Sequence, residues 1–356
     1  MDRVGCADPE KFALTSPRES SPDVSIIVVN FKGGDALEAC LVSLFHDQSK
    51  ANREIWVVDN DSADDSPAVI ERLVATQSGV DWMASPENVG YAAGVDLALP
   101  RCRGRYVAVL NMDTVIESGW LDPLVEYLDT HHKAAAASPL ITVADGSAIN
   151  AAGQWIHQTG LGFNRALGRP LDAVGDMPFS VAGIHGAAFM VRRHLLEQIG
   201  GMDSGGFLYH EDVNLSWLLR LMGYELACVP RARVRHDYFL SMHAEKLALL
   251  ERNREAMLRA YLTPETRRKL WGWRSLTECM LWIYAGMRGP TFLRAKHRAR
   301  KWVQAQTELI ERRRQLAESL RARTDQEVLA AMTRRYPIGQ LMALAGERGT
   351  PRRPLS

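Results

Sequence analysis

The chain has 356 residues, of which 46% are hydrophobic and 24% charged, and its formal net charge is +1. This length suits one large domain with a smaller extension and allows a sizeable buried core. The near-zero net charge argues against nucleic acid as a partner. The five cysteines are scattered without CxxC spacing, which argues against a disulfide framework or zinc site and predicts reduced thiols in the cytoplasm. No signal-peptide pattern opens the sequence, and no apolar run approaches the roughly 20 residues that span a bilayer.

Strand and helix patterns alternate four times after an aperiodic segment, residues 1–22, which we expect to be a disordered lead-in. The expected strands are 24–29, 54–58, 80–83 and 105–110, and helical spacing follows at 37–45, 66–74, a segment ending at 99, and 121–128. Short connections between alternating elements predict an α/β sheet with mainly parallel strands and right-handed crossovers.

Three of these strands end in polar residues. Asn30 follows the first strand, Asp-Asn-Asp-Ser at 59–62 follows the second, and Asn111 and Asp113 follow the fourth. Ligands bind beyond the carboxyl ends of strands in such sheets, so we expect these side chains to converge on one crevice. Asp59 is placed to accept a hydrogen bond from a nucleobase N–H or a ribose hydroxyl.

Crowded carboxylates and amides suggest a divalent cation, because hard metal ions take oxygen ligands and bridge phosphate oxygens. Asp113 is the best candidate ligand, and His236, at the end of a late strand, could complete the coordination. A histidine in such a place is more often structural, so from the residues alone both roles stay open. The loop that contains Asn88 and Gly90 precedes a helix, where backbone N–H groups can bind phosphate.

Periodicity is lost from about 140 to 180, which predicts long loops or edge strands. Order returns with a strand at 187–191, a helix at 194–199, and strands at 225–229 and 233–236.

The acidic pair Glu211-Asp212 begins a further helical pattern that contains Trp217. We expect both carboxylates in or just before its first turn, where the helix dipole should keep them ionised. Taken alone, such a pair is usually an N-terminal cap on a surface helix. Tyr209 and His210, directly before it, instead suggest a polar cleft.

Helical patterning dominates residues 241–335, and residues 336–356 are expected to form a flexible tail. Between Arg294 and Arg323 there are ten Lys and Arg residues but three Glu. Two interpretations stay open for this helical region: a solvated appendage, or a pair of helices that docks on a membrane surface or a partner.

The order of these motifs along residues 24–240 resembles that of inverting nucleotide-sugar glycosyltransferases of family 2, and is most similar to their rhamnosyltransferase-like branch. The motifs are Val-Val-Asn at 28–30, Val-Val-Asp-Asn-Asp-Ser at 57–62, Asn-Val-Gly-Tyr-Ala-Ala-Gly at 88–94, Leu-Asn-Met-Asp-Thr at 110–114, Gly-Ala-Ala-Phe-Met-Val-Arg at 186–192, Gly-Gly-Met-Asp at 200–203 and Phe-Leu-Tyr-His-Glu-Asp-Val-Asn-Leu-Ser-Trp at 207–217. The resemblance implies a GT-A fold over 23–240, in which a Rossmann-like nucleotide-binding sheet is joined to an acceptor-binding half, with the helical region as a C-terminal extension.

The resemblance also implies roles for individual residues. Asp212 would be the catalytic base, and Glu211 would orient it, touch the acceptor or cap the helix. Asp113 and His236 would bind Mg²⁺ or Mn²⁺. The implied nucleotide-sugar-binding residues are Asn30, Asp59, Asn60, Ser62, Asn88, Gly90, Asn111 and Asp113, and the implied acceptor-binding residues are His185, Gly186, His210 and Trp217.

The implied partners are a nucleotide-sugar donor, with thymidine-diphosphate rhamnose suggested by the branch, and a surface-glycan or lipid-linked saccharide acceptor. A cytoplasmic protein with peripheral attachment to the inner face of the membrane would suit such an acceptor. The oligomeric state stays open.

Two positions depart from the family pattern. Asn111-Met-Asp113 stands where many relatives have Asp-x-Asp, which lowers the charge of the expected metal site. Asn214 stands where relatives often have Asp, which leaves the base in place but alters the surroundings of the acceptor.

Three other classes of protein were weighed. A dinucleotide-dependent oxidoreductase needs G-x-G-x-x-G directly after the first strand, and residues 30–35 do not fit. A nucleotidyltransferase needs a basic glycine-rich loop at the same place, and only residues 32–34, Lys-Gly-Gly, partly match such a loop. A catalytically inactive binding or scaffold protein on the same fold is the remaining alternative, and the retained Asp113, Asp212 and His236 argue against it.

Overall fold

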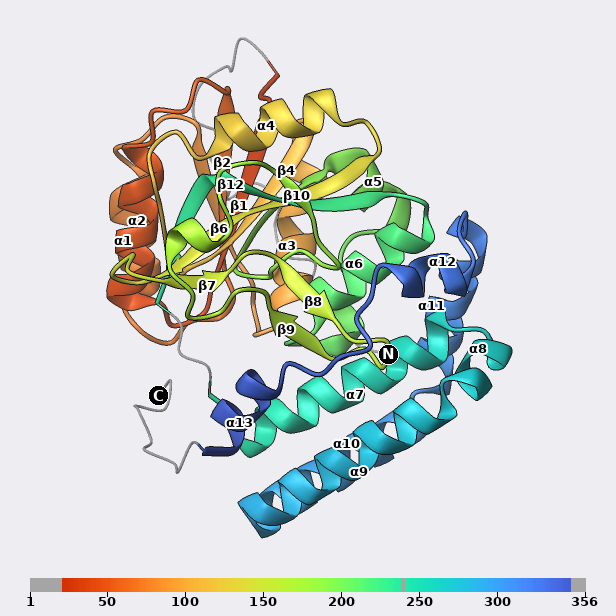
Figure 1. Cartoon of the computed structure of the whole chain (residues 1–356). Helices are drawn as coiled ribbons and strands as arrows, with labels where there is room; N and C mark the ends of the chain where they lie inside the picture. Colours follow the sequence, from red (N-terminus) through yellow and green to blue (C-terminus); the bar gives the residue numbers. More distant parts are fainter. Residues whose placement is uncertain (1–20, 238–240, 347–356) are drawn as a thin grey trace, which may run out of the picture.

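A central mixed β-sheet organises the chain (Figure 1). The computed structural model describes residues 21–237 and 241–346. The sheet order is β10-β12-β6-β11-β4-β1-β2-β3, with β5 paired to β12, β7 paired to β6, and β8 and β9 forming a separate small sheet. The strands are β1 (Val24–Asn30), β2 (Arg53–Asp59), β3 (Val80–Ala84), β4 (Tyr106–Asn111), β5 (Thr114–Ile116), β6 (Ala134–Val143), β7 (Ile149–Ala151), β8 (Gln154–Ile156), β9 (Gly162–Asn164), β10 (Phe179–Ser180), β11 (Ala188–Arg192) and β12 (Glu225–His236).

The first half of the chain forms the parallel part of the sheet, as the alternating pattern predicts. β1 pairs in parallel with both β2 and β4, and β2 pairs in parallel with β3. The helices between these strands are α1 (Gly34–Phe45), α2 (Ser66–Val74), α3 (Tyr91–Ala98) and α4 (Leu121–Thr130). Apolar residues of α1, α2 and α4 pack into one core cluster, and those of α3 pack into another. Strand order reverses at β1, where ligands bind in such sheets.

The second half departs from a simple parallel sheet. β11 runs antiparallel to β4 and β6, and β12 runs parallel to β6. The two strands predicted at 225–229 and 233–236 are one strand, β12, with a register shift between Val229 and Arg233. β6 is central to the sheet, yet the sequence did not predict it. Its Ala-rich start and Pro139 have low strand propensity, so long-range pairing must specify this strand.

The acidic pair occupies the first turn of α6 (Glu211–Leu221), as predicted. This helix is not on the surface, because every residue from Val213 to Leu221 is buried. It packs with α3 and α5 (Arg193–Ile199) in the same core cluster, between the sheet and the C-terminal helices. A surface cap is therefore the wrong explanation for the pair.

The C-terminal helices cover this side of the sheet (Figure 1). They are α7 (Ala244–Tyr261), α8 (Pro264–Lys269), α9 (Trp271–Arg288), α10 (Pro290–Ala305), α11 (Thr307–Leu320), α12 (Asp325–Ala330) and α13 (Ile338–Gly346). α7 packs on α6, α10 and α11. The paired helices α9 and α10 lie beyond α7, on the side away from the sheet.

Two terminal segments were predicted to lack structure. The expected lead-in falls almost entirely on residues 1–20, outside the described residues, as do residues 347–356 of the expected tail. Within that tail, 338–346 form α13, so the helical region continues further than predicted. None of the helices in the described residues has the length and apolar character needed to cross a membrane.

Candidate functional site

The carboxyl ends of β1 and β2 share one hydrogen-bond network. Asn30 Nδ2 donates to Asp59 Oδ1 (2.8 Å) and to Ser62 Oγ (3.0 Å). Asp59 Oδ2 accepts from the backbone N–H of Ser62 (3.1 Å). Asn30 and Asp59 are register neighbours, so the parallel pairing itself brings them together. The structure thus places three of the predicted nucleotide-binding residues side by side, with Asp59 fixed in orientation.

A second network fixes the loop before α3. Asn60 donates to Asn88 Oδ1 (3.0 Å) and to the Gly90 carbonyl (3.2 Å), and it accepts from the Val89 N–H (3.0 Å). Gly90 has a φ of +87°, and a Cβ there would lie 2.1 Å from the Phe207 carbonyl oxygen. The glycine is therefore required, because it lets this loop lie directly against the segment that leads to α6.

Asp113 and His236 meet at the ends of β4 and β12. The Nε2 atom of His236 lies 3.2 Å from Asp113 Oδ1, and the Asp237 N–H donates to the Asp113 carbonyl (3.1 Å). Asp113 Oδ1 is buried and, although His236 Nε2 lies nearby, it accepts no well-aligned hydrogen bond from the described residues. An imidazole nitrogen and a carboxylate oxygen at this separation fit two adjacent ligand positions on a divalent cation.

No third side chain completes this pair, since the described part of the chain contains no group of three metal-ligating residues. Mg²⁺-type sites often use one or two carboxylates and take their remaining ligands from substrate phosphates and water. The donor set therefore fits a cation that is held jointly with a phosphorylated substrate.

His185 lies beside this pair, with its ring centroid 6.2 Å from that of His236. Burial, together with the neighbouring His236, lowers the pKa of His185 to about 3. Its Nδ1 accepts from the Ala187 N–H (3.2 Å), and the Ala187 carbonyl accepts from the Asn111 N–H (2.9 Å). The neutral His185 ring is thus fixed next to Asn111.

Asp212 is held by three donors at the start of α6. Its Oδ2 accepts from the Gly186 N–H (2.9 Å) and from Gln154 Nε2 (2.8 Å), and its Oδ1 accepts from the Val213 N–H (2.8 Å). A Cβ on residue 186 would lie 3.0 Å from Asp212 Oδ2, so Gly186 allows the close approach. Gln154 was not predicted, because nothing in its irregular segment distinguishes it from other surface polar residues.

Tyr91 connects the acidic pair to the strand ends. Its hydroxyl donates to the Gly186 carbonyl (3.1 Å), and its N–H donates to the Phe207 carbonyl (2.9 Å). Burial raises the Tyr91 pKa well above its ordinary value, and the carboxylates of Glu211, Asp212 and Asp113 raise it further. Residues 185 and 186 also join the acidic pair to the Asp113 site, because Gly186 donates to Asp212 while the adjacent His185 ring lies beside His236.

The expectation that the helix dipole keeps both carboxylates ionised is wrong for Glu211. Burial raises the pKa of Glu211 to about 8, and the charge of Asp212 raises it further. Burial also raises the pKa of Asp212, although its three donors oppose the shift. Desolvation outweighs the dipole here because the protein around the start of α6 covers much of both side chains, which are only partly exposed.

The segment before α6 has an unusual backbone. Phe207, Tyr209 and His210 all have positive φ, at 68°, 67° and 75°, although none is a glycine. Such conformations cost energy and persist only when their surroundings impose them. We call residues 203–210 the base loop, because it delivers the chain to Glu211 and Asp212.

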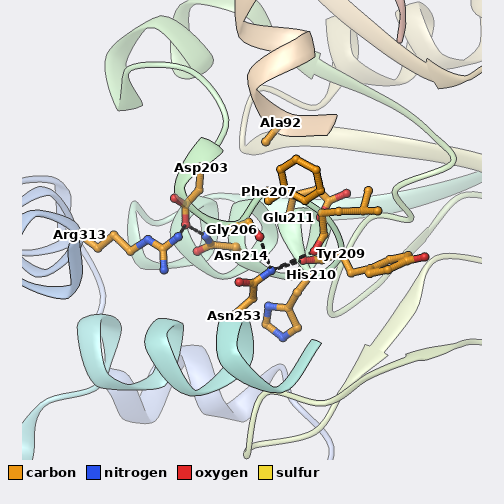
Figure 2. A pocket seen from close by; sticks show the side chains of 11 residues that line it. Ala92, Asp203, Gly206, Phe207, Tyr209, His210, Glu211, Asn214, Asn253 and Arg313 are labelled. Carbon is orange, nitrogen blue, oxygen red and sulfur yellow. Dashed lines mark hydrogen bonds and ion pairs between the residues drawn. The ribbon is translucent and has the colours of Figure 1, made fainter. Parts of the chain in front are cut away.

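Side chains from the C-terminal helices hold the base loop (Figure 2). Asn253 on α7 donates to the carbonyls of Gly206 (3.1 Å), Leu208 (3.1 Å) and Tyr209 (2.8 Å). Arg313 on α11 forms a largely buried ion pair with Asp203, which also accepts from Asn214 on α6. The helical region is therefore part of the scaffold of the site, not the solvated appendage considered above.

Two predicted acceptor-binding residues are not available to an acceptor. Trp217 is fully buried in the main core cluster, five residues along α6 from Asp212. His210 is also buried, and its Nε2 donates to the Gly160 carbonyl (2.8 Å). Helical spacing alone could not distinguish an inward-facing Trp217 from one that faces a cleft, because every face of α6 is covered.

Comparison with known proteins finds glycosyltransferases. Residues 25–200 match the model of the family described as Glycosyl transferase family 2. A pre-mycofactocin glycosyltransferase of Mycobacterium tuberculosis is 26% identical over 224 residues, which are 62% of this chain and 43% of that protein. An N-acetylglucosaminyl-diphospho-decaprenol L-rhamnosyltransferase of the same species is 26% identical over 233 residues, which are 59% of this chain and 75% of the relative. The match thus spans less than half the length of the first relative.

Solved structures show the fold. The crystal structure of GalNAc-T7 with UDP, GalNAc and Mn²⁺ has a TM-score of 0.58 at 16% identity, covering 82% of this chain and 57% of that one. The crystal structure of S. aureus TarS has a TM-score of 0.53 at 14% identity, covering 87% and 54%. The predicted GT-A architecture with a C-terminal helical region is confirmed.

Proposed function

Because this chain contains a glycosyl transferase family 2 domain, we propose that it is an inverting, metal-assisted glycosyltransferase with Asp212 as its general base. The acceptor is a hydroxyl of a surface-glycan or lipid-linked saccharide, and the donor is a nucleoside-diphosphate sugar. The observation that carries this proposal is the fixed carboxylate of Asp212, which is held by Gly186 and Gln154 and is joined through the adjacent His185 to the pair Asp113 and His236.

The base performs one proton transfer in a single displacement. The acceptor oxygen forms a bond to the anomeric carbon while the bond from that carbon to the diphosphate breaks, so the configuration inverts. A sugar hydroxyl is a poor nucleophile until its proton is accepted, and Asp212 accepts it as the new bond forms. The hydrogen bonds to both carboxylate oxygens fix the orientation of the base before the substrate binds.

The donor occupies the carboxyl ends of β1, β2 and β4. Asp59, held by Asn30 and Ser62, accepts from the nucleobase. Asp113 and His236 would hold the cation, which would supply positive charge opposite the departing diphosphate. With Asn111 in place of a carboxylate, this site carries one negative charge less than an Asp-x-Asp site.

Rhamnose is the narrower form of the proposal. It rests on the similarity to the L-rhamnosyltransferase named above and on the Asn-x-Asp sequence at 111–113. A panel of nucleotide sugars, each assayed for hydrolysis and transfer with Mg²⁺ or Mn²⁺, tests both the broad proposal of a glycosyltransferase and the narrower one of a rhamnosyltransferase. Metal-dependent turnover of thymidine-diphosphate rhamnose supports the narrow form, and turnover of another donor supports only the broad one. Absence of turnover together with absence of nucleotide binding in calorimetry would favour the inactive scaffold.

We expect loss of either cation ligand to weaken metal-dependent nucleotide binding. Asp113→Asn and His236→Ala should each lower nucleotide affinity in the presence of Mn²⁺ by about tenfold or more, with little effect when the metal is chelated. Calorimetric titration measures both affinities. Asp61→Asn is the matched control, because Asp61 is exposed at the neighbouring strand end and tolerates Asn at its φ of 63°. Equal losses in this control would contradict the assignment.

Glu211→Gln is expected to stabilise the fold above neutral pH. An unfolded Glu ionises near pH 4.5, whereas folded Glu211 ionises near pH 8, so the wild type loses stability as pH rises through this window. The variant avoids that loss, and its advantage should grow above pH 4.5 to a few kcal/mol, at most about 5 kcal/mol, above pH 8, and vanish below pH 4.5. Urea unfolding at several pH values measures it. Glu87→Gln, at an exposed site, serves as the control and should show no such pH dependence.

A further inference from the structure

The outer face of α9 is apolar along its whole length. Trp271, Trp273, Leu276, Ile283 and Met287 are exposed by 71%, 37%, 47%, 58% and 67%. The remaining exposed residues of this helix are Gly, Ser and Cys, so the face carries no charge. At about 1.5 Å per residue, the 18 residues of α9 present a stripe about 27 Å long. Soluble surfaces rarely leave such a stripe uncovered.

The charged residues of α9 fix this orientation. Glu278 accepts from Arg254 Nη2 (2.7 Å) on α7 and from Lys296 Nζ (2.9 Å) on α10. Arg274 donates to Glu255 (2.8 Å), again on α7. Rotation of α9 to hide its apolar face would break these partly buried ion pairs. The exposed stripe is therefore specified by the interior of the protein.

The neighbouring helix α10 adds positive charge. Its sequence contains no Asp or Glu, and Arg294, Arg298, Arg300 and Lys301 are all exposed. Arg298 pairs with the exposed Glu245, whereas the other three form no ion pair with a described residue. An uncharged apolar helix face beside uncompensated cations is typical of a helix that lies in the interface of an anionic membrane.

We propose that the α9–α10 hairpin binds the surface of an anionic lipid bilayer, with the apolar stripe of α9 inserted at the level of the headgroups. α13 extends the contact, since Ile338 and Met342 are exposed by 63% and 65%. The Tyr284 hydroxyl of α9 donates to the Leu344 carbonyl (3.5 Å), which joins α13 to the end of the stripe. This surface is separate from the proposed active site, and its test does not depend on activity.

A second copy of the chain fits this surface less well. In a two-fold dimer the stripe of each copy would cover that of the other. The basic residues of the two copies would then lie close together and repel each other. α10 contains no carboxylate, and Glu278 of α9 is already paired with Arg254 and Lys296. Anionic headgroups supply that compensation, at about 1 kcal/mol for each basic residue near the surface.

Vesicle co-sedimentation of the whole chain tests the proposal. Phosphatidylcholine vesicles with phosphatidylglycerol are compared with pure phosphatidylcholine vesicles, and light scattering in solution records the oligomeric state. The variant Ile283→Glu/Met287→Glu removes the stripe, and Arg300→Gln/Lys301→Gln removes two cations. The matched controls are Met177→Glu, at a side chain that is 78% exposed in the sheet domain, and Lys133→Gln, also exposed there.

The wild type should bind only the anionic vesicles. The stripe variant should bind them about tenfold or more weakly and the cation variant roughly twentyfold more weakly, with both controls unchanged. Absence of wild-type binding, or unchanged binding of the stripe variant, would overturn the proposal. A dimer that is lost in the stripe variant, without any vesicle binding, would show that the stripe binds a second copy instead.

Discussion

Asp212→Asn is expected to lower kcat by about two to four orders of magnitude, the usual contribution of a positioned general base. The amide keeps the shape of the side chain but cannot accept the proton of the acceptor hydroxyl. The change replaces one carboxylate oxygen by an NH2 group. The remaining carbonyl oxygen can still accept hydrogen bonds from Gly186 and Gln154. Nucleotide affinity should change little, because the proposed donor site lies at the ends of β1, β2 and β4 and not on α6. Steady-state kinetics and calorimetry measure the two quantities.

The pH dependence of kcat distinguishes a base from a merely structural residue. Asp212 must be deprotonated to act, so wild-type kcat should fall as pH decreases through its raised pKa. The loss begins at a higher pH than for an ordinary carboxylate. The residual kcat of Asp212→Asn should not show this fall as pH decreases. If the variant has wild-type kcat, or if its kcat falls with decreasing pH as the wild type does, Asp212 is not the general base.

Asn253→Ala is expected to lower kcat by about a hundredfold, although Asn253 is not placed to touch a substrate. The change removes three hydrogen bonds to carbonyls of the base loop, whose positive φ angles then lose their support. A displacement of Asp212 by about 1 Å can cost this much. Nucleotide affinity should be retained, since Asp59 and Asp113 lie on other elements. Kinetics and calorimetry on the same preparation measure the difference.

A matched control separates positioning from general destabilisation. Asn150→Ala truncates another buried asparagine, on β7, away from the base loop, and urea unfolding of both variants measures how far each change destabilises the fold. If Asn150→Ala lowers kcat as much as Asn253→Ala does, the base loop has no special dependence on α7. If only Asn253→Ala does so, the C-terminal helices position the base.

Local sequence patterns predicted most of the parallel half of the fold. Apolar runs and helical spacing placed β1 to β4 and α1 to α4 within a few residues of their observed bounds. The convergence of Asn30, Asp59 and Asn111 also followed, because parallel pairing brings the ends of neighbouring strands together. The positions of Asp113 beside His236, and of Asp212 at a helix start, agree with the predicted site.

Other features depended on contacts between distant segments. The first half of β6 lacks a strand-like sequence, and its pairing with β11 and β12 specifies it as a strand. Gln154 and Asn253 contact Asp212 and the base loop across 58 and about 50 residues of chain, so no local pattern identifies them.

The sequence by itself thus determined the order of the elements, the parallel half of the sheet and the acids at its strand ends, because these depend on local periodicity and on simple rules of topology, whereas the GT-A fold was implied by the resemblance of the motifs. Tertiary structure alone decided that α6 is buried, that Trp217 faces the core, and that Glu211 has a pKa of about 8. The physical reason is that the charge state of a carboxyl group depends on desolvation by everything packed around it. The C-terminal helices, far along the chain, supply part of that packing and also hold the loop that presents the base.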